Sequence, residues 1–510
     1  MSDSNRPNVH SNLSSISRRS ALKAATSLAA PLLVHAQNRQ PNILFVIADD
    51  WGYGHASVYG CDWISTPGFD RVARQGVLFT NAFTSNPKCS PCRATILTGR
   101  NTWQLKEAVN HYSVFPRDFP VYPDLLEKAG YFVGMTGKGW GPGDYASTGW
   151  PHNPAGREFQ QRKLKPPAEG IAADDYSGNF QDFLSQKPKD KPFCFWLGGR
   201  EPHRPYEPGS GLRAGKKLES VKLPAYFPDN KIVRSDLLDY ALEVEWFDRH
   251  LNLALDHLAA IGELDNTLVI ASSDHGMPFP RVKGQIYEDA FHIPMAACWG
   301  NRFKGGRSIT DFINTRDLAP TILEGAGVSA PGTITGTSFL SLLTSGKSGK
   351  IDPTRNVMLV GKERHDLGRP NDWGYPVRAI RTEEYFYVRN YEPDRWPAGN
   401  PETGYRNVDD GPTKEFMLSR FDNYYQMAFG KRPAEELYLV KEDPQNIKNL
   451  ARDPKYAMIK RQLRERLDEQ LRSEGDPRAL GQAEFFDTIE YTGPRVHSYS
   501  EWLKRSSAPR

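Results

Sequence analysis

The chain has 510 residues, too many for one simple core, and its 38% hydrophobic and 25% charged residues are typical of a globular protein. Lys and Arg total 65 against 61 Asp and Glu, and the resulting net charge of +4 gives no case for a nucleic-acid-binding protein. No apolar run approaches the ~18 residues that span a bilayer, so we expect no stable membrane insertion.

The first 36 residues have the layout of an export signal. Arg18 and Arg19 precede a modest apolar stretch at residues 24–34, and Val34-His35-Ala36 resembles a small-residue cleavage site. This order is typical of a bacterial twin-arginine signal, which carries proteins that are already folded. We therefore expect a periplasmic or extracellular protein whose folded part begins at residue 37.

Strands and helices alternate over most of the folded part. Residues 42–48 form a continuous apolar run, typical of a strand buried on both faces. The pattern then predicts helices over 66–75, 122–129 and 235–260, strands over 77–83, 131–136, 193–197, 267–272 and 293–298, and a short strand and a helix within 311–327. Such alternation predicts an α/β fold with a large, mainly parallel sheet flanked by helices. Reactive groups in such folds gather beyond the carboxyl ends of the strands.

The pattern changes after residue 375. Residues 378–390 alternate like one strand with a solvated face, another short strand begins at Glu436, and residues 453–474 read as a charged amphipathic helix. These features predict a smaller C-terminal α+β subdomain with an antiparallel sheet. We expect the catalytic domain to span residues 37–375 and the subdomain to span residues 376–510.

Acidic residues follow two of the predicted buried strands. Asp49 and Asp50 come directly after the first strand, and Asp274 and His275 follow the strand over 267–272. Adjacent carboxylates repel unless a cation lies between them. Carboxylate oxygens suit calcium or magnesium, whereas a histidine nitrogen leaves manganese or zinc open. Converging strand ends would therefore make a divalent metal site.

The cysteines do not form a disulfide framework, because five of them are scattered along the chain: Cys61, Cys89, Cys92, Cys194 and Cys298. The run C-S-P-C at residues 89–92 has redox-like spacing, so its surroundings must decide its role. It continues as R-A-T-I-L-T-G-R to residue 100. Cys89 precedes a predicted helix whose amino end favours negative charge, and Arg93 adds a guanidinium beside it. A thioredoxin-like motif does not explain Arg93 or the T-G-R tail.

The run at residues 89–100 resembles the signature of type I sulfatases, C-x-P-x-R followed by T-G-R. The resemblance implies an alkaline-phosphatase-like fold in which Cys89 is modified to formylglycine by a formylglycine-generating enzyme. The hydrated aldehyde is the nucleophile in that family. The resemblance also implies one Ca²⁺, held by the modified residue 89 together with Asp49, Asp50, Asp274 and His275.

Other family motifs follow in the family's order, and the resemblance covers roughly residues 40–475. Lys138 lies in T-G-K-G-W-G-P, His203 in R-E-P-H-R-P, and Lys283 shortly after S-D-H-G-M-P-F-P. The resemblance implies that Lys138 and Lys283 clamp the sulfate and that Arg93 and the cation stabilise the nucleophilic oxygen. His203, aided by Lys283, would then protonate the leaving group.

The lysine loop departs from the family pattern, which is Lys-x-His. Here Trp140 stands where the histidine is usual, and an indole has an N–H donor but cannot act as a base. A histidine from another loop is one replacement, with His111, His152 and His365 as candidates. Slower turnover is another outcome, and a non-catalytic protein that binds sulfated glycans is a third.

The P-H-R and D-H-G-M-P-F-P runs resemble the sulfamidases, the N-sulfoglucosamine sulfohydrolases of heparan breakdown, more than they resemble arylsulfatases. We therefore expect N-sulfoglucosamine or a related sulfated polysaccharide fragment as the substrate. An O-sulfatase acting on algal-type polysaccharides and a phosphoester hydrolase on the same fold remain alternatives. The candidates for substrate binding are His111, Arg204, Arg364 and His365.

Overall fold

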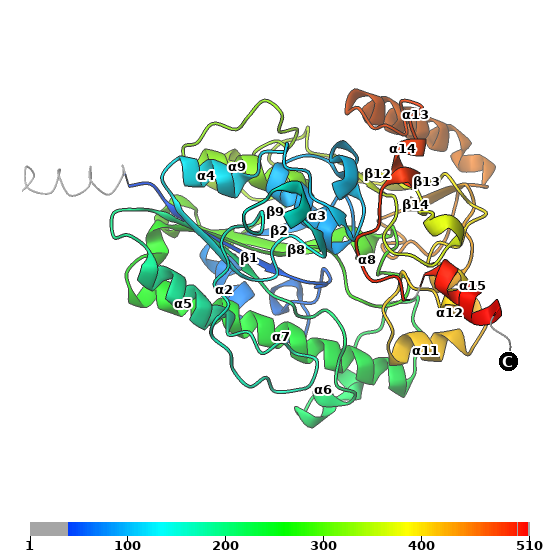
Figure 1. The fold of residues 1–510 in the computed structure, drawn as a ribbon, viewed down its shortest axis with the longest axis horizontal. Coiled ribbons are helices and arrows are strands. Elements are labelled where there is room, and N and C mark those ends of the chain that lie inside the picture. Colours follow the sequence, from blue (N-terminus) through cyan, green and yellow to red (C-terminus); the bar gives the residue numbers. More distant parts are fainter. Residues whose placement is uncertain (1–38, 497, 508–510) are drawn as a thin grey trace, which may run out of the picture. The chain divides into compact units, whose positions relative to one another are not determined.

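The computed structural model describes residues 39–496 and 498–507 (Figure 1). The predicted export signal at residues 1–36 lies outside them. Within the described part, no helix combines the length and the hydropathy needed to cross a membrane.

The large sheet has the strand order β10-β2-β8-β7-β1-β6-β4, and β9 pairs with β2 beside this path. Only β8 runs antiparallel to the other strands of this described sheet, so the predicted mainly parallel sheet is confirmed. The strands are β1 Asn42–Ala48, β2 Val77–Phe83, β4 Phe132–Gly137, β6 Phe193–Gly198, β7 Thr267–Ser273, β8 His292–Cys298, β9 Arg307–Ile309 and β10 Ile313–Asn314.

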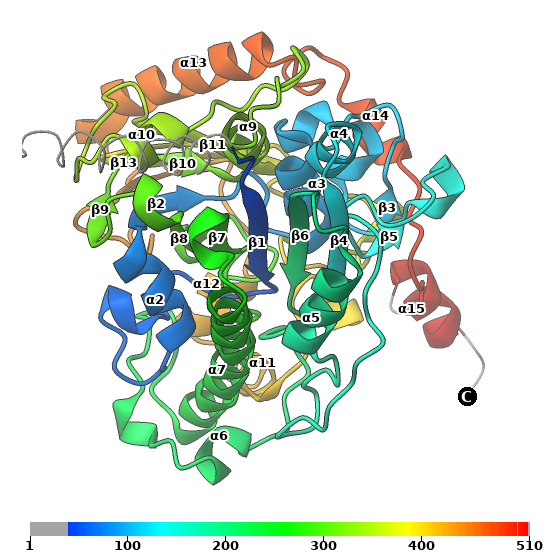
Figure 2. The ribbon, with the colours of Figure 1, turned by 90° about the vertical axis from the view of Figure 1, so that its left-hand side faces the viewer.

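Helices cover both faces of this sheet. Alternate residues of each strand point to opposite sides, and both sets are mainly apolar in β1, so both faces are buried. Leu44 and Val46 of β1 pack with α2 Pro67–Gln75, α5 Tyr176–Gln186 and α7 Lys231–Ala260. Phe45 and Ile47 pack with the helices of the other face, α3 Cys89–Thr98, α4 Tyr122–Lys128, α9 Leu318–Gly325 and α10 Leu340–Thr344. Figure 2 shows α5 and α7 on one side of β1 and α3, α4 and α9 toward the other. This arrangement confirms the helical flanks expected from the sequence.

A second sheet is antiparallel throughout, in the order β11-β12-β13-β14. Helix α13, Ala457–Ser473, covers one of its faces with Leu463, Leu467 and Leu471. The predicted antiparallel sheet with a packed helix is therefore confirmed. The strands are β11 Val357–Lys362, β12 Val377–Thr382, β13 Tyr385–Asn390 and β14 Glu435–Leu439.

The prediction of one strand over residues 378–390 is wrong, because β12 and β13 are two strands of a hairpin. Arg381 pairs with Phe386 across a turn at Glu383 and Glu384. That turn contains no Gly, Pro, Asn or Asp, the residues that normally mark a turn in a sequence. The alternating pattern therefore runs through the turn without a signal.

The second sheet begins at β11, on the amino side of residue 375, and both sheets belong to one compact unit that starts at Pro41. The boundary at residue 375 stays a prediction. The described chain also contains short 3-10 helices and these shorter strands and α-helices: β3 Ser113–Val114, β5 Gly143–Asp144, α6 Ser210–Arg213, α8 Glu288–Phe291, α11 Pro412–Leu418, α12 Asn423–Phe429, α14 Glu484–Thr488 and α15 Tyr499–Ser507.

Candidate active site

The carboxyl ends of β1 and β7 bring the predicted acidic residues together. The two strands pair in parallel up to Ala48 and Ser273, so Asp49 and Asp274 follow at the same edge of the sheet. The backbone of Asp50 adopts φ 75°, which is uncommon for a residue other than glycine, and its N–H donates to Asp274 Oδ1 at 3.1 Å. This bend keeps both carboxylates of the Asp49-Asp50 pair buried at the strand end.

The ring of His275 lies between the carboxylates and Cys89. Its Nδ1 donates to the Gly276 carbonyl at 3.1 Å, which leaves Nε2 to face the cluster. Nε2 lies 3.0 Å from Asp50 Oδ1 and 3.4 Å from Cys89 Sγ. Burial lowers the pKa of His275, but Asp274 and Asp50 raise it more strongly, to about 9. Positive charge at this point is therefore strongly favoured.

These residues fit a divalent cation. The ligand atoms of Asp49, Cys89, Asp274 and His275 all lie within 4.8 Å of one another, and all four residues are buried. In the described part of the chain, the buried oxygens Asp49 Oδ1 and Asp50 Oδ1 accept no well-aligned hydrogen bond, although Arg93 Nη2 lies 3.5 Å from the first and His275 Nε2 lies 3.0 Å from the second. Burial raises the pKa of Asp274 to about 6, as expected for a carboxyl that lacks full neutralisation. Oxygen-rich, incompletely satisfied donors are what a hard cation requires.

The two cysteines of the C-S-P-C run have opposite environments on α3. Burial and Asp49 raise the pKa of the Cys89 thiol, but Lys138, Lys283 and His275 together hold it well below its usual range. Burial raises the pKa of the Cys92 thiol, and Cys92 packs in the hydrophobic core on the face of the large sheet that α3 covers. All five cysteines are free. These environments favour Cys89 over Cys92 as the reactive position, and Cys92 is buried in the core.

Arg93 is fully buried and holds the site together. Its Nε donates to Asp274 Oδ2 at 2.9 Å, and its Nη1 donates to the carbonyls of Lys138 at 2.6 Å and Gly139 at 3.1 Å. The guanidinium therefore joins the end of β7 to the lysine loop that follows β4.

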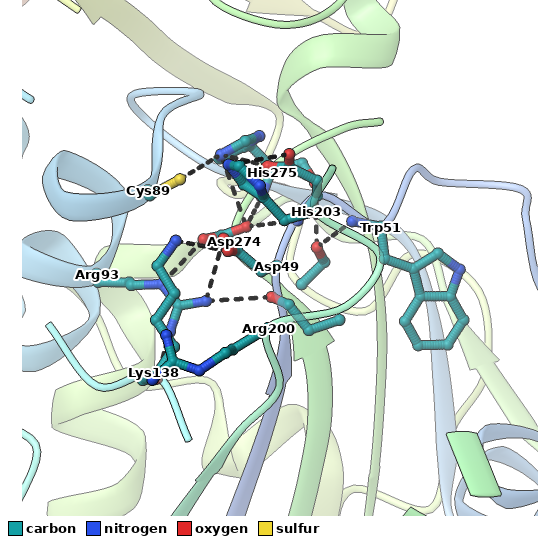
Figure 3. A network of polar contacts seen from close by, with 12 residues as sticks. Asp49, Trp51, Cys89, Arg93, Lys138, Arg200, His203, Asp274 and His275 are labelled. Carbon is teal, nitrogen blue, oxygen red and sulfur yellow. Dashed lines mark hydrogen bonds and ion pairs between the residues drawn. The ribbon is translucent and has the colours of Figure 1, made fainter. Parts of the chain in front are cut away.

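A cavity of about 870 Å³ opens beside the cluster, and its lining includes Asp49, Cys89, Lys138 and His203. Lys138 Nζ lies 2.5 Å from Asp49 Oδ2. Although burial raises the pKa of Asp49, Lys138 and Arg93 hold it well below its usual range. The Asp49 carboxylate therefore stays ionised beside the cavity. Figure 3 shows Cys89, Lys138, His203 and His275 converging on the same point from different segments.

His203 is oriented by its own backbone neighbour. Its Nδ1 donates to the Arg204 carbonyl at 2.7 Å, and its Nε2 lies 4.0 Å from Asp50 Oδ2. The side chain is 34% exposed, in contrast to the buried carboxylates. This geometry leaves Nε2 available to a group in the cavity.

Lys283 is placed differently from Lys138. Its Nζ is fully buried, 2.5 Å from Asp50 Oδ2 and 3.4 Å from Asp409 Oδ2. Among the described residues Lys283 does not line the cavity. Its predicted contact with sulfate is therefore less direct than that of Lys138.

Of the three histidines considered as replacements in the lysine loop, His111 lines the cavity, whereas His152 and His365 do not. Asp366 Oδ1 accepts from His111 Nδ1 at 2.8 Å, and His111 Nε2 has no partner among the described residues. Trp140 lines the cavity but is 98% buried, with its ring edge-to-face against Phe115 at 5.0 Å. Of these three, His111 is the histidine that the fold brings to the cavity, which His203 also lines.

The other three candidates for substrate binding make hydrogen bonds within the protein, although Arg364 Nε and His365 Nδ1 have no partner among the described residues. Arg204 lines the cavity, but its guanidinium donates to both oxygens of Asp236 and to the Pro278 carbonyl. Arg364 donates to the carbonyls of Ile489 and Glu490, and His365 Nε2 lies 2.8 Å from Asn86 Oδ1. These contacts favour structural roles for Arg204, Arg364 and His365 over the predicted contact with substrate.

The sequence analysis missed several charged residues of the cavity, among them Lys88, Asp366 and Asp409. Lys88 Nζ lies 2.8 Å from Asp366 Oδ2, so Asp366 joins Lys88 to His111. Lys88 precedes Cys89 and Asp366 follows His365, so both adjoin residues that the motifs singled out. Asp409 lies in a stretch without predicted elements, and no local pattern marks it.

Comparison with known proteins identifies the family. A model described as Sulfatase matches residues 41–328, and one described as N-sulphoglucosamine sulphohydrolase, C-terminal, matches residues 280–397. An ulvan-active sulfatase of Formosa agariphila is 28% identical over 448 residues, covering 86% of this chain and 82% of the relative. The N-sulphoglucosamine sulphohydrolase of Homo sapiens is 28% identical over 474 residues, covering 84% of this chain and 89% of the relative.

A solved structure of a protein in complex with its substrate D-glucosamine-2-N,6-O-disulfate has a TM-score of 0.61. It is 20% identical and covers 86% of this chain and 99% of that chain, which supports the predicted alkaline-phosphatase-like fold. Since the Sulfatase model matches more than half of the residues, the chain belongs to the type I sulfatase family, near N-sulphoglucosamine sulphohydrolase, whose members hydrolyse sulfate esters or sulfamates.

Proposed function

We propose that this protein removes sulfate from a sulfated saccharide by means of a formylglycine made from Cys89. One observation carries the proposal. Cys89 is the first residue of α3 and lines the cavity, and its Sγ lies within 4.8 Å of ligand atoms of Asp49, Asp274 and His275. In the proposed active form, the aldehyde oxygen of formylglycine takes the place of Cys89 Sγ. The aldehyde, once hydrated, supplies the nucleophilic oxygen.

Asp49, Asp50, Asp274, His275 and the modified residue 89 would hold one divalent cation, which we propose to be Ca²⁺ because carboxylate oxygens predominate. When bound, the cation would supply positive charge for the nucleophile and for a sulfate oxygen. Arg93 keeps Asp274 and the lysine loop in place around it through its buried hydrogen bonds.

Lys138 and His203 act from the cavity. The Lys138 ammonium would bind a sulfate oxygen, since it already lies at the cavity wall beside Asp49. His203 Nε2 would donate a proton to the leaving oxygen or nitrogen, because Nδ1 is fixed on the Arg204 carbonyl. Lys283 would neutralise Asp50 and Asp409 and so keep the site compact.

For the saccharide we propose N-sulfoglucosamine or a related heparan-type fragment, on the basis of the matching C-terminal model and the human relative. The Formosa agariphila relative favours a second candidate, an O-sulfated algal-type polysaccharide. Turnover of N-sulfated glucosamine compared with O-sulfated monosaccharides distinguishes the two. We also propose export through the twin-arginine signal at residues 1–36, after modification of Cys89 by a formylglycine-generating enzyme.

Mass spectrometry of the tryptic peptide that contains Cys89 tests the proposal. After expression in a host that matures sulfatases, we expect a loss of about 18 Da relative to cysteine, because SH and H are replaced by O. Cys89→Ser should keep the metal and abolish turnover. If the protein is active while Cys89 is unmodified, formylglycine is not its nucleophile and the proposal is wrong. Full activity of Cys89→Ser would indicate phosphatase-type chemistry.

A further inference from the structure

The far C-terminal segment returns to the cavity. We call residues 489–496 the strap. Tyr491 and Pro494 of the strap line the cavity, together with Ser498 beyond it. Figure 2 shows the segment in red between α14 and α15, running past β3 and β5. The strap lies outside the residues that either family model matches, which end at 328 and 397.

Hydrogen bonds hold the strap at its amino end. Arg364 Nη1 donates to the Ile489 carbonyl at 2.8 Å, and Nη2 donates to the Glu490 carbonyl at 3.0 Å. The Thr492 N–H donates to the Tyr112 carbonyl at 2.8 Å, just before β3. Arg364, one of the candidates for substrate binding, therefore positions the strap against the cavity.

Two tyrosines meet where the strap reaches the cavity. The rings of Tyr112 and Tyr491 lie 5.2 Å apart at 45°, and both residues line the cavity. Tyr112 adopts φ 50°, a left-handed conformation that costs free energy and persists only where its surroundings hold it. Gly493 leaves room for its ring, since a Cβ there would lie 2.4 Å from Tyr112 Cδ1. The strap thus sets the position of Tyr112.

A polar group adjoins the two rings. His111 lies edge-to-face with Tyr112 at 4.7 Å, and its buried Nε2 is without a partner among the described residues. Because Asp366 accepts from Nδ1, Nε2 is the ring nitrogen that is left for a hydrogen bond with a bound molecule. Aromatic surface combined with a few directed polar groups is typical of a small-molecule site.

We propose that Tyr491, Tyr112 and His111 form a subsite for the sugar ring next to the sulfate, with the tyrosine rings against its C–H surface and His111 Nε2 hydrogen-bonded to a hydroxyl. This subsite deepens the proposed function and rests on it. The strap would then decide which saccharides bind, while the metal cluster and Cys89 act on the sulfate.

The test measures binding without turnover, in the Cys89→Ala protein, by calorimetry with N-sulfated and O-sulfated disaccharides. Tyr491→Ala and Gly493→Ala should each weaken binding of the preferred disaccharide about tenfold, the size of one aromatic contact. The Kd of these variants for inorganic sulfate should stay within about twofold of the parent value, because no contact to sulfate changes. Matched controls are Gly332→Ala, where an added Cβ meets nothing within 4 Å, and Phe421→Ala, whose ring is 74% exposed and does not line the cavity.

The same variants, with Cys89 restored, are assayed for turnover of the disaccharide and of 4-nitrophenyl sulfate, which has no sugar. A loss confined to the disaccharide supports the subsite. Equal losses for both substrates, or unchanged disaccharide binding in both strap variants, would overturn it. If no disaccharide binds the parent while 4-nitrophenyl sulfate is hydrolysed, the subsite fails and the sulfatase proposal stands. If the disaccharide binds through Tyr491 but nothing is hydrolysed, the proposed function fails instead.

Discussion

The candidate metal site, formed by Asp49, Asp50, Cys89, Asp274 and His275, and the strap border the same cavity, but they are held in different ways. In the cluster, fully buried charged side chains form ion pairs: Arg93 pairs with Asp274, and Lys283 pairs with Asp50. The strap depends on hydrogen bonds to backbone carbonyls and on the half-exposed pair of Arg495 and Asp372. Loss of one member of a buried ion pair leaves an uncompensated charge, whereas a lost neutral hydrogen bond costs less. We therefore expect changes in the cluster to abolish activity and changes in the strap to tune it.

The largest effect should come from Asp274→Ala. It leaves the buried Arg93 guanidinium without its closest carboxylate and removes a proposed metal ligand. We expect about 3–5 kcal/mol lower stability of the metal-free protein in urea unfolding and no measurable turnover. Asp62→Ala, which breaks an exposed pair with Lys222, should change stability by less than about 1 kcal/mol. Similar stabilities of the two variants would contradict the contrast between buried and exposed charges.

His203→Ala should change catalysis without changing stability, although His203 lines the same cavity as Asp49. Its side chain is 34% exposed, so we expect little change in the free energy of unfolding. Loss of a general acid should lower kcat about 10²–10⁴-fold toward a sulfated sugar. The loss should be smaller toward 4-nitrophenyl sulfate, whose leaving group needs less protonation. Equal losses in kcat for the two substrates would argue against the acid role.

The third prediction concerns pH and the metal. Burial lowers the pKa of His275 and the carboxylates raise it to about 9, above the value of ~6.5 in the unfolded chain. The stability that the protonated ring gives to the metal-free protein is complete below pH ~6.5 and is lost as the pH rises through 9. The proposed Ca²⁺ would compete with this proton, so the rise in Tm on adding Ca²⁺ should be larger at pH 9 than at pH 6.5.

Differential scanning fluorimetry with and without Ca²⁺ measures this difference. His275→Asn is the matched control, because an amide does not titrate and should flatten the dependence on pH. A larger rise at pH 6.5 in the parent protein would contradict the assignment of His275 to the cation site.

The smallest effect is expected in the strap. Arg364→Met removes the two hydrogen bonds to Ile489 and Glu490 and keeps an apolar stem of similar length. We expect about 1–2 kcal/mol lower stability, KM for the disaccharide raised several-fold and kcat unchanged. Arg157→Met, which breaks an exposed pair with Glu127, should leave KM unchanged. A fall in kcat with KM constant would mean that Arg364 acts on the reacting groups instead.

Much of the fold could be predicted because strand burial on two faces leaves continuous apolar runs. The runs at 42–48 and 77–83 correspond to β1 and β2 without a shift, whereas the hairpin of β12 and β13 was missed because its turn has no turn residues. Asp49 and Asp274 were predictable together, since the carboxyl ends of parallel neighbours share one edge of the sheet.

Local pattern determined which elements form and which strand ends carry acidic groups, because each depends on neighbours within a few residues. Only the tertiary structure decided that Lys283 is buried against Asp409, that His111 and Asp366 share a hydrogen bond, and that Arg364 holds a strap 125 residues further along the chain. Such contacts join segments far apart in the sequence through irregular loops, where no periodicity fixes the direction of a side chain. Their partners are set by how the two sheets and the C-terminal segment pack together.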